Sequence, residues 1–194
     1  MADLTLDYRV TAPTIRAFHQ SPAFIRVQMG PIGSGKTTAK NDERAVRSAQ
    51  QAPGPDGVRR TRWALIRNTA PELTSTTIKS FKQWFPDGVG KWTLDSPITF
   101  TLRRGDIEAE FLFLALDRDD DVRKLLSLEL TGAYLNEARE IPKSVLDAVT
   151  GRVGRYPPMR DGGPTWRGVI ADTNPPDSEH WLYRLAEVER PEGF

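Results

Sequence analysis

The sequence predicts an α/β fold in which helices flank a mainly parallel sheet and an antiparallel hairpin is added to it. Three observations lead to this prediction. Apolar, strand-like segments alternate with helix-like segments along the 194 residues, as they do when crossover helices join parallel strands. Residues 98–116 hold two apolar runs separated by R-R-G-D, which indicates a hairpin. Residues 30–37 read G-P-I-G-S-G-K-T and fit the phosphate-binding loop pattern, so we assign the fold to the P-loop NTPases.

The segments around this loop support the assignment. Residues 23–29 are mostly apolar and predict a strand, and residues 36–52 contain neither Pro nor Gly and predict a helix. Glycines let several backbone N–H groups turn into one hollow, and the dipole of the helix adds partial positive charge. We therefore predict a nucleotide site in which Lys36 reaches the β- and γ-phosphates and the Thr37 hydroxyl binds Mg²⁺. The predicted phosphate-binding residues are Gly30, Pro31, Ile32, Gly33, Ser34, Gly35, Lys36, Thr37 and Thr38.

The rest of the chain continues the alternation. The pattern predicts strands at 60–67, 98–102, 107–116, 130–135 and 166–171, and helices at 71–84, 120–129, 142–150 and 177–188. Asp177 or Ser178 is the expected N-cap of the last helix. Ligands of such sheets bind at the carboxyl ends of the parallel strands. We therefore expect one site to gather the polar runs at 30–37, 67–69, 136–137 and 173–174.

A P-loop needs a second strand that brings a carboxylate to the metal and to the attacking water. The best candidate is T-G-A-Y-L-N-E at 131–137. An Asp normally stands at the penultimate position and coordinates Mg²⁺. Asn136 stands there in this chain, able to hold a metal-bound water but uncharged, and its replacement by Asp should be tolerated. Glu137 is predicted to polarise water for attack on the γ-phosphate, with Glu140 as a competing carboxylate.

The composition of the chain excludes several classes of protein. Hydrophobic residues make up 38% and charged residues 27% of the chain, which is typical of a globular protein with one core. No apolar run approaches the roughly 20 residues that span a bilayer, so we expect no membrane association. There is no cysteine, and two histidines cannot build a zinc site. The net charge of +1 gives no overall attraction to nucleic acid. We interpret the arginines at 152–167 as a solvated surface and the acidic run at 117–121 as a solvated turn.

The motifs, in this order, resemble the ATPase domain of large terminase subunits, the DNA-packaging motors of tailed bacteriophages. The matching pieces are G-P-I-G-S-G-K-T at 30, R-N-T-A-P-E-L-T-S-T at 67, R-K-L-L-S-L-E-L at 123, T-G-A-Y-L-N-E-A-R-E-I-P at 131, and A-D-T-N-P-P with H-W-L-Y at 171–183. They cover nearly the whole chain. The pieces from residue 130 onward are much more specific than the P-loop, which many families share.

The resemblance implies an ATP-hydrolysing motor, with ATP and Mg²⁺ as cofactors, that translocates double-stranded DNA into a procapsid. It implies the portal protein and the small terminase subunit as further partners. Such proteins form homo-oligomeric rings when docked, and an isolated domain is expected to be monomeric. The expected location is the host-cell cytoplasm and, transiently, the portal vertex of the procapsid, but not the mature virion.

For single residues, the resemblance makes Glu137 the catalytic carboxylate, and makes Thr173 and Asn174 the coupling motif that senses the γ-phosphate. Arg123 is the nearest match to an arginine finger that acts on a neighbouring subunit, with Arg152 as the alternative. Gln20 lies just before the first strand, where a residue usually contacts adenine.

Three features depart from the family pattern. Many members have Asp where this chain has Asn136, and some carry an Arg where this loop has Pro31 and Ile32. The family usually adds a C-terminal nuclease domain. The sequence shows no later carboxylate cluster for such a domain, so we expect residues 1–194 to form a single P-loop ATPase domain.

Other functions remain open from the sequence. A helicase-like ATPase shares the motif order but should carry a second sheet domain. A nucleotide kinase needs an Arg-rich lid, which residues 152–167 could imitate. A nucleotide that only holds a scaffold together would leave Glu137 without a role.

Overall fold

A seven-stranded sheet organises the part of the chain that the structure describes, which is residues 12–31, 33–117 and 121–194 of a computed structural model. Its order is β1-β7-β6-β2-β5-β4-β3. The strands are β1 (Ile25–Met29), β2 (Arg59–Arg67), β3 (Gly90–Thr93), β4 (Ile98–Arg104), β5 (Ile107–Ala115), β6 (Gly132–Asn136) and β7 (Gly168–Thr173). The strands from β1 to β5 in this order are parallel, and β4 and β3 continue the sheet in antiparallel pairs. The predicted α/β fold, with its mainly parallel sheet and added hairpin, is confirmed.

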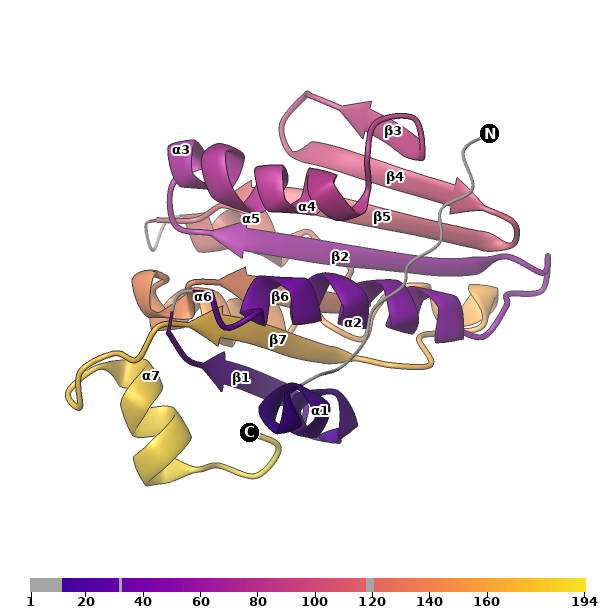
Figure 1. The fold of residues 1–194 in the computed structure, drawn as a ribbon. Coiled ribbons are helices and arrows are strands. Elements are labelled where there is room, and N and C mark those ends of the chain that lie inside the picture. The colour runs from indigo at the N-terminus through magenta and orange to yellow at the C-terminus, as the bar shows by residue number, and fades with distance from the viewer. Residues whose placement is uncertain (1–11, 32, 118–120) are drawn as a thin grey trace.

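Helices cover both faces of the sheet (Figure 1). They are α1 (Pro13–Gln20), α2 (Lys36–Gln50), α3 (Ala70–Glu72), η1 (Leu73–Ile78), α4 (Lys79–Trp84), α5 (Val122–Leu126), η3 (Ala138–Glu140), α6 (Lys143–Thr150), η4 (Met159–Asp161), α7 (Trp181–Tyr183) and η5 (Arg184–Glu189). In Figure 1, α1, α2 and the run α3–η1–α4 lie in front of the sheet, α5 and α6 lie behind it, and α7 lies beyond β1. The molecule therefore has three layers, as two-sided burial of a parallel sheet requires.

Each face of the sheet has its own core. On the front face, Phe81 of α4 stacks on Phe85 with ring centres 4.6 Å apart and meets Phe111 of β5 at 5.0 Å. The back core is mostly aliphatic and includes Leu135 of β6 with Val145, Leu146 and Val149 of α6. Side chains of a strand alternate between the faces. The central strands therefore contribute to both cores, which is why they read as nearly continuous apolar runs in the sequence.

Several element boundaries differ from the sequence prediction. Strand β3 and helix α1 were not predicted, because each is short and its apolar pattern is brief. The predicted helix at 120–129 is present as the shorter α5, and residue 120 lies outside the described residues. The last helix begins at Trp181, and neither Asp177 nor Ser178 is its N-cap. His180 takes that role, because its Nδ1 accepts a hydrogen bond from the backbone N–H of Leu182 at 3.1 Å.

The predicted helix at 71–84 is one helical run with a π-helical middle, η1. Two threonine hydroxyls bond back to the helix backbone there, Thr74 to Ala70 O at 3.1 Å and Thr76 to Glu72 O at 2.6 Å. Such bonds compete with the regular ladder and favour local distortion. The wider turn presents Thr77 to the end of β6, where its hydroxyl bonds to Asn136 Oδ1 at 2.8 Å.

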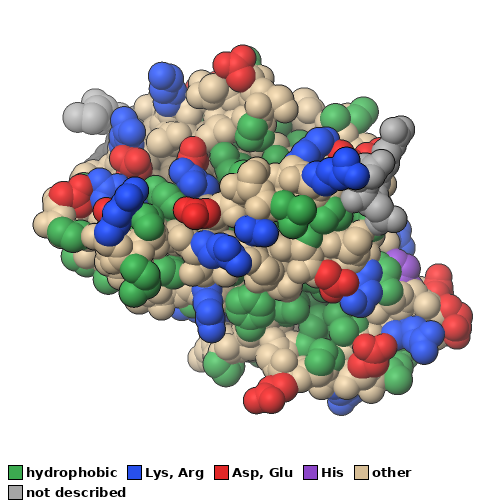
Figure 2. All heavy atoms as spheres, turned by 180° about the vertical axis from the view of Figure 1, so that it is seen from behind, with side chains coloured by type: hydrophobic (Ala, Val, Ile, Leu, Met, Phe, Trp, Pro, Cys, Tyr) green, Lys and Arg blue, Asp and Glu red, His purple; other side chains and the backbone are tan. Residues whose placement is uncertain are grey.

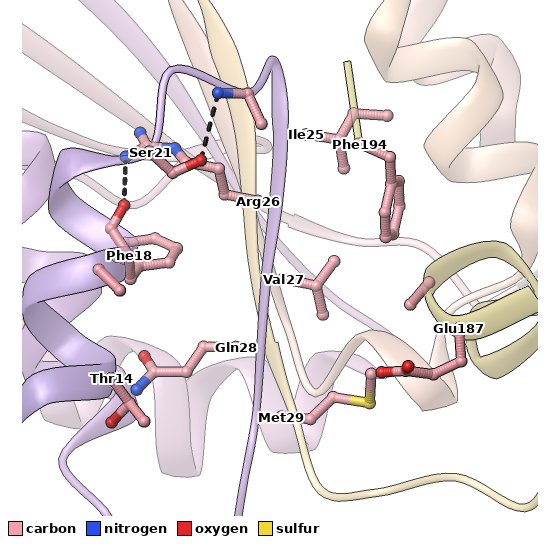
Figure 3. Close-up of a pocket in the computed structure, with 13 residues that line it drawn as sticks. Thr14, Phe18, Ser21, Ile25, Arg26, Val27, Gln28, Met29, Glu187 and Phe194 are labelled. Atoms are coloured by element: carbon pink, nitrogen blue, oxygen red, sulfur yellow. Dashed lines mark hydrogen bonds between the residues drawn. The ribbon is translucent and has the colours of Figure 1, made fainter. Parts of the chain in front are cut away.

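Strand β1 is the edge of the sheet, and a groove of about 460 Å³ follows it. Figure 3 shows Gln28 on the α1 side of this strand, and Val27 on the side that faces Phe194. The C-terminal residues reach the start of the strand, because Ile25 N–H donates to Gly193 O at 2.9 Å. The groove therefore lies between α1 and the C-terminal segment, along the strand that leads into the P-loop.

Charges of both signs share the face behind the sheet. Figure 2 shows basic and acidic side chains intermixed there, with apolar side chains between them. Within the described ranges, no helix is both long enough and apolar enough to cross a bilayer.

Candidate nucleotide site

The P-loop connects the carboxyl end of β1 to the start of α2. Gly35 is the N-cap of α2 with φ 76°, and Gly33 has φ 81°. Both values fall in the left-handed region that glycine enters without steric cost. The pattern of glycines therefore has a direct backbone reason at these two positions. Ile32, which was predicted to bind phosphate, lies outside the described residues.

A pocket of about 350 Å³ opens over this loop. Its lining residues are Gly33, Ser34, Gly35, Lys36, Thr37, Thr38 and Glu137. Six of them come from the loop and the first turn of α2, and the seventh comes from the end of β6. The structure thus brings six of the predicted phosphate-binding residues to one cavity with the predicted catalytic carboxylate, although they lie far apart in the sequence. Gly30 and Pro31 are not among the lining residues.

Lys36 points its ammonium group across the mouth of the loop. Nζ donates to Gly30 O at 2.6 Å and Pro31 O at 2.8 Å, and lies 3.4 Å from Asn174 Oδ1. The same donor is therefore shared between the P-loop and the segment that follows β7. This is the position from which a lysine can reach the phosphates of a nucleotide.

Glu137 directly follows β6 and has φ 53°, an uncommon backbone conformation for a residue with a side chain. Its N–H and its carboxylate are both hydrogen-bonded to residues around the end of β7. Its N–H donates to Asp172 Oδ1 at 3.1 Å, and its Oε2 accepts from Asn174 N–H at 3.1 Å. The competing carboxylate, Glu140, does not line the P-loop pocket and instead pairs with Arg67, with 2.7 Å between Nη1 and Oε2.

The predicted coupling motif, Thr173 and Asn174, lies between the P-loop lysine and Glu137. Thr173 Oγ1 accepts from the N–H of Arg139 at 3.2 Å and donates to Asn174 O at 2.9 Å. Asn174 contacts Lys36 through its side chain and Glu137 through its N–H. A shift of Asn174 would therefore change its contacts with both Lys36 and Glu137.

Asn136 is buried, and its amide is fully engaged below the pocket. Oδ1 accepts from Thr77, and Nδ2 donates to Tyr134 OH at 2.9 Å and to Asp172 Oδ1 at 3.0 Å. It is not among the residues that line the P-loop pocket. This arrangement does not support the prediction that Asn136 binds the metal, because its oxygen is directed to Thr77.

Asp172 is the principal residue of the site that the sequence prediction missed. It is 1% exposed at the end of β7, and its Oδ2 lies 3.3 Å from the Thr37 hydroxyl. The signal was present in the sequence, because Asp172 is an acidic residue at the end of an apolar strand, directly before Thr173. A charge in that position points to the carboxyl edge where ligands bind.

A buried layer of charged side chains lies beneath the loop, on the inward face of α2. Burial lowers the pKa of Lys40 to about 7, although the negative charge of Asp172 opposes this shift. Lys40 Nζ donates to Gln28 Oε1 at 2.6 Å and sits 3.3 Å from the ring centre of Phe18. Burial also lowers the pKa of Arg44 to about 10, and its guanidinium covers the ring of Tyr134 at 4.5 Å. Sequence periodicity did not reveal this layer, because charged residues in a helix normally face solvent.

Gln20 is not near the P-loop pocket. It ends α1 and lines another cavity, to which α2 contributes residues from Asp42 to Gln50. Asp42 is six residues after Lys36, which is about 9 Å along the helix at 1.5 Å per residue. Gln20 is thus not among the residues that line the P-loop pocket, and its contact with adenine stays a prediction. Ile15, on the same helix, is closer, because its Cδ1 would lie 3.6 Å from a Cβ placed on Gly35.

The two candidate arginine fingers lie at opposite edges of the sheet. Arg123 is exposed near the start of α5, which follows the carboxyl end of β5. Arg152 lies by the amino end of β6, because its carbonyl accepts from Leu130 N–H at 3.1 Å. Neither is among the residues that line the P-loop pocket of its own chain.

The residues present fit a magnesium nucleotide. The loop offers backbone N–H groups and Lys36 for phosphate oxygens, and the hydroxyl of Thr37 for the metal. Among the described residues there is no group of three or more His, Cys, Asp or Glu side chains that could hold a metal ion by itself. Mg²⁺ usually keeps several waters and binds through few protein ligands together with substrate phosphates, so this donor set suits an ion that arrives with the nucleotide.

Comparisons with known proteins show which fold the chain shares. No family model and no curated protein sequence matches the chain. Solved structures do match it. The large terminase of a thermophilic bacteriophage has a TM-score of 0.67 and 14% identity over 92% of this chain and 44% of that one. The large terminase of bacteriophage HK97 has a TM-score of 0.60 and 12% identity over 90% and 35%.

The ATPase domain of the large terminase from Thermus phage P74-26 has a TM-score of 0.53 and 20% identity over 86% of this chain and 66% of that one. Structures of the thermophilic phage protein in complex with ADP and with ATP-gamma-S also match. The chain therefore has a P-loop α/β fold, and among such folds it has that of the ATPase domains of phage large terminases. It spans less than half the length of the thermophilic phage protein.

Proposed function

We propose that this chain is the ATP-hydrolysing motor domain of a viral DNA-packaging terminase, which couples ATP hydrolysis to the translocation of double-stranded DNA into a procapsid. The observation that carries the proposal is the shared pocket of the P-loop and Glu137, within a fold that resembles terminase ATPase domains. Binding alone would not need a carboxylate in this place. Hydrolysis does, because water must be polarised beside the γ-phosphate.

Each residue of the pocket has a part in this reaction. The loop N–H groups and Lys36 bind and orient the phosphates, and Mg²⁺, when bound, neutralises the charge that develops on them. Glu137 takes up the proton of the attacking water. Asn174, which contacts both Lys36 and Glu137, is placed to respond to the γ-phosphate and to pass that response to β7.

A nucleotide kinase is the less favoured function. The arginines at 152–167 could imitate its lid in the sequence, but Arg152 and Arg155 lie beside Leu130 before β6, and Arg167 directly precedes β7. These positions are at the amino edge of the parallel strands, whereas the P-loop pocket is at the carboxyl edge. Arginines there cannot close over the phosphates of the same chain. A helicase-like ATPase remains the alternative that the ATP chemistry alone does not separate.

Partners and location are part of the proposal. A packaging motor acts on double-stranded DNA, docks as a homo-oligomeric ring on a portal protein, and is loaded by a small terminase subunit. Its place is then the host-cell cytoplasm and, transiently, the portal vertex. Support comes from the likeness in fold to phage packaging proteins, including the bacteriophage Phi-29 packaging motor assembly, with a TM-score of 0.50.

The test is ATP hydrolysis with and without long duplex DNA. We expect hydrolysis that duplex DNA stimulates, loss of Mg·ATP binding in Lys36→Ala, and retained binding without turnover in Glu137→Gln. Glu140→Gln is the matched control, because it removes a carboxylate that lies outside the pocket. Full activity of Lys36→Ala, or an inactive Glu140→Gln beside an active Glu137→Gln, would contradict the assignment. Stimulation by single strands and not by duplex would favour the helicase-like alternative.

A further inference from the structure

Asp172 occupies the centre of the site, and the proposed mechanism so far gives it no part. Its two carboxylate oxygens accept four hydrogen bonds. Oδ1 accepts from Asn136 Nδ2 at 3.0 Å and from Glu137 N–H at 3.1 Å. Oδ2 accepts from Tyr134 OH at 2.9 Å and from the Thr37 hydroxyl at 3.3 Å. One buried side chain thus joins the P-loop helix, the end of β6 and the residue proposed to polarise water.

The place of Asp172 in the sheet relates it to Asn136. The two residues are direct partners in the pairing of β6 with β7. Position 136 is where a carboxylate is expected in a P-loop site of this kind, and this chain has an amide there. The carboxylate is found one strand away, at the paired position, with its oxygen 3.0 Å from that amide.

We propose that Asp172 supplies from β7 the carboxylate of the metal site that Asn136 does not supply from β6. The inference rests on the proposed function, because it concerns the same Mg·nucleotide site. Asp172 is a positioning residue. By accepting the hydroxyl proton of Thr37 it leaves the oxygen lone pairs of that hydroxyl free for Mg²⁺, and by accepting the N–H of Glu137 it holds the carboxylate of that residue over the pocket.

The electrostatic surroundings suit a buried carboxylate. Burial lowers the pKa of Lys40 and of Arg44, and the negative charge of Asp172 opposes this shift in both. Burial is the main cause that raises the pKa of Tyr134, and the charge of Asp172 adds to it, so the phenol keeps its proton and donates it to Asp172. A buried charge is tolerated when it is paired and hydrogen-bonded, and both conditions hold here.

Asp172→Asn separates this role from a merely structural one. The new amide oxygen can accept from Asn136 and Glu137, and the new NH₂ group can donate to the two hydroxyls, which are able to accept. The fold should therefore survive, although the hydroxyl proton of Tyr134 loses its acceptor on position 172. The direction of the bond to Thr37 is reversed, however, so that a lone pair of its hydroxyl is used by the amide and the negative charge is lost. A deficit in Mg²⁺ binding is then expected in a folded protein.

The experiment measures the affinity for ADP by calorimetry, with Mg²⁺ and with EDTA, in parallel with thermal unfolding of the nucleotide-free protein. In the wild-type chain we expect Mg²⁺ to tighten binding. In Asp172→Asn we expect that effect to shrink about 10- to 100-fold, the range found when groups that orient metal ligands are removed, while affinity in EDTA stays near wild type. Thr77→Val is the matched control. It removes a buried hydrogen bond to Asn136 and leaves Asp172 intact, so the Mg²⁺ effect should remain.

The exchange variant Asn136→Asp with Asp172→Asn gives the second arm. It keeps one carboxylate and one amide in the pair, so we expect it to fold. The Mg²⁺ effect should stay reduced, because position 136 is bonded to Thr77 and the negative charge beside Thr37 is still missing from position 172. An unchanged Mg²⁺ effect in Asp172→Asn overturns the proposal, and so does a folded exchange variant with the Mg²⁺ effect of the wild type. If Asp172→Asn does not fold, the Mg²⁺ effect in the exchange variant is the only test of the proposal. Unfolding of both variants would show that position 172 needs its carboxylate for folding itself, and would also overturn the proposal.

Failure of this inference and failure of the proposed function give different results. A wild-type chain that binds neither ADP nor ATP in either buffer would contradict the proposed function. A wild-type chain that binds ADP more tightly with Mg²⁺, together with an Asp172→Asn chain that does the same, would leave the function standing and remove only the role of Asp172.

Discussion

Asn136 accepts a hydrogen bond from Thr77 and donates two from its amide nitrogen, to Tyr134 and Asp172. Its polar atoms are therefore matched to a donor on one side and to acceptors on the other. The pattern of motifs suggested that an aspartate would be tolerated at this position. The structure leads to the opposite expectation, because a carboxylate has no hydrogen to donate and would face the carboxylate of Asp172 in a buried place.

We therefore predict that Asn136→Asp destabilises the fold. Two buried carboxylates would compete for the same donors, and an unsatisfied buried polar group costs about 1–3 kcal/mol. Urea unfolding of the wild-type and variant chains measures the loss. The control is the same change in the Asp172→Asn background, where one carboxylate again meets one amide and the loss should be smaller. Equal losses in both backgrounds would show that the two side chains are not coupled.

The lowered pKa of Lys40 leads us to predict that the free energy of unfolding depends on pH. Burial lowers its pKa from 10.5 to about 7 in the folded protein, whereas the unfolded chain keeps the ordinary value. Between these two pH values the unfolded state binds more protons, so stability rises with pH. The contribution is fully present above the unfolded pKa and is lost as the pH falls through about 7.

The measurement compares wild type with Lys40→Met, which keeps a similar length without the charge. We expect the wild type to gain up to about 1.4 kcal/mol of unfolding free energy per pH unit relative to the variant, between pH 7 and pH 10. Parallel pH profiles of the two proteins over this range would mean that Lys40 is charged in the fold.

At the scale of elements, the site depends on how closely β6 can approach the helices and aromatic rings around it. A Cβ on Gly132 would lie 2.5 Å from Trp63 Cζ3 and 2.8 Å from Trp166 Cζ3. These two indole rings stack with centres 5.2 Å apart and cover the start of the strand. The glycine thus lets β6 sit under the rings, and the same strand ends at Asn136 and Glu137.

We predict that Gly132→Ala costs about 1–3 kcal/mol of unfolding free energy, because overpacking a dense core forces side chains and backbone to shift. Nucleotide turnover should fall as well, since β6 carries Glu137 into the pocket. Gly151→Ala is the control. Gly151 has φ −73°, and a Cβ there would meet its nearest neighbour, Ala148 O, at an ordinary 3.5 Å. If both alanine variants unfold at the same urea concentration, the close approach of β6 is not important.

At the scale of the whole molecule, the question is whether the pocket is completed by a second copy. Arg123 is exposed on α5, and the proposed ring would place a basic residue of one subunit against the nucleotide of the next. An arginine finger is worth about 10³–10⁵ in rate in well-studied enzymes. A solvated arginine on a short helix would contribute nothing of this kind.

Mixing two inactive variants distinguishes these cases. Arg123→Ala subunits combined with Glu137→Gln subunits should recover part of the ATPase activity, because some interfaces pair an intact arginine with an intact carboxylate. The ATPase rate is measured across mixing ratios, in a preparation shown by light scattering to assemble. An assembled mixture without recovery would point to Arg152 or to a finger that acts within one chain.

Much of the fold could be predicted because the relevant signals are local. The P-loop glycines, the helix that follows them and the apolar strands are each visible in a short window, and parallel strands place their carboxyl ends together. For this reason the predicted phosphate-binding residues and Glu137 were found to share a pocket. The place of Gln20 could not be predicted in the same way, because proximity in sequence to β1 does not show which end of the strand a residue lies beside.

The sequence by itself determined the α/β architecture, the P-loop and the carboxylate at Glu137, because periodicity, glycine placement and motif spacing are properties of the chain. Only the tertiary structure decided what Asn136 and Asp172 do. They are 36 residues apart and become partners through the pairing of β6 with β7. It also decided the state of Lys40, because burial and the field of neighbouring charges depend on which elements pack together. Local sequence patterns predict neither the pairing of Asn136 with Asp172 nor the lowered pKa of Lys40, since both arise from contacts between segments that are distant along the chain.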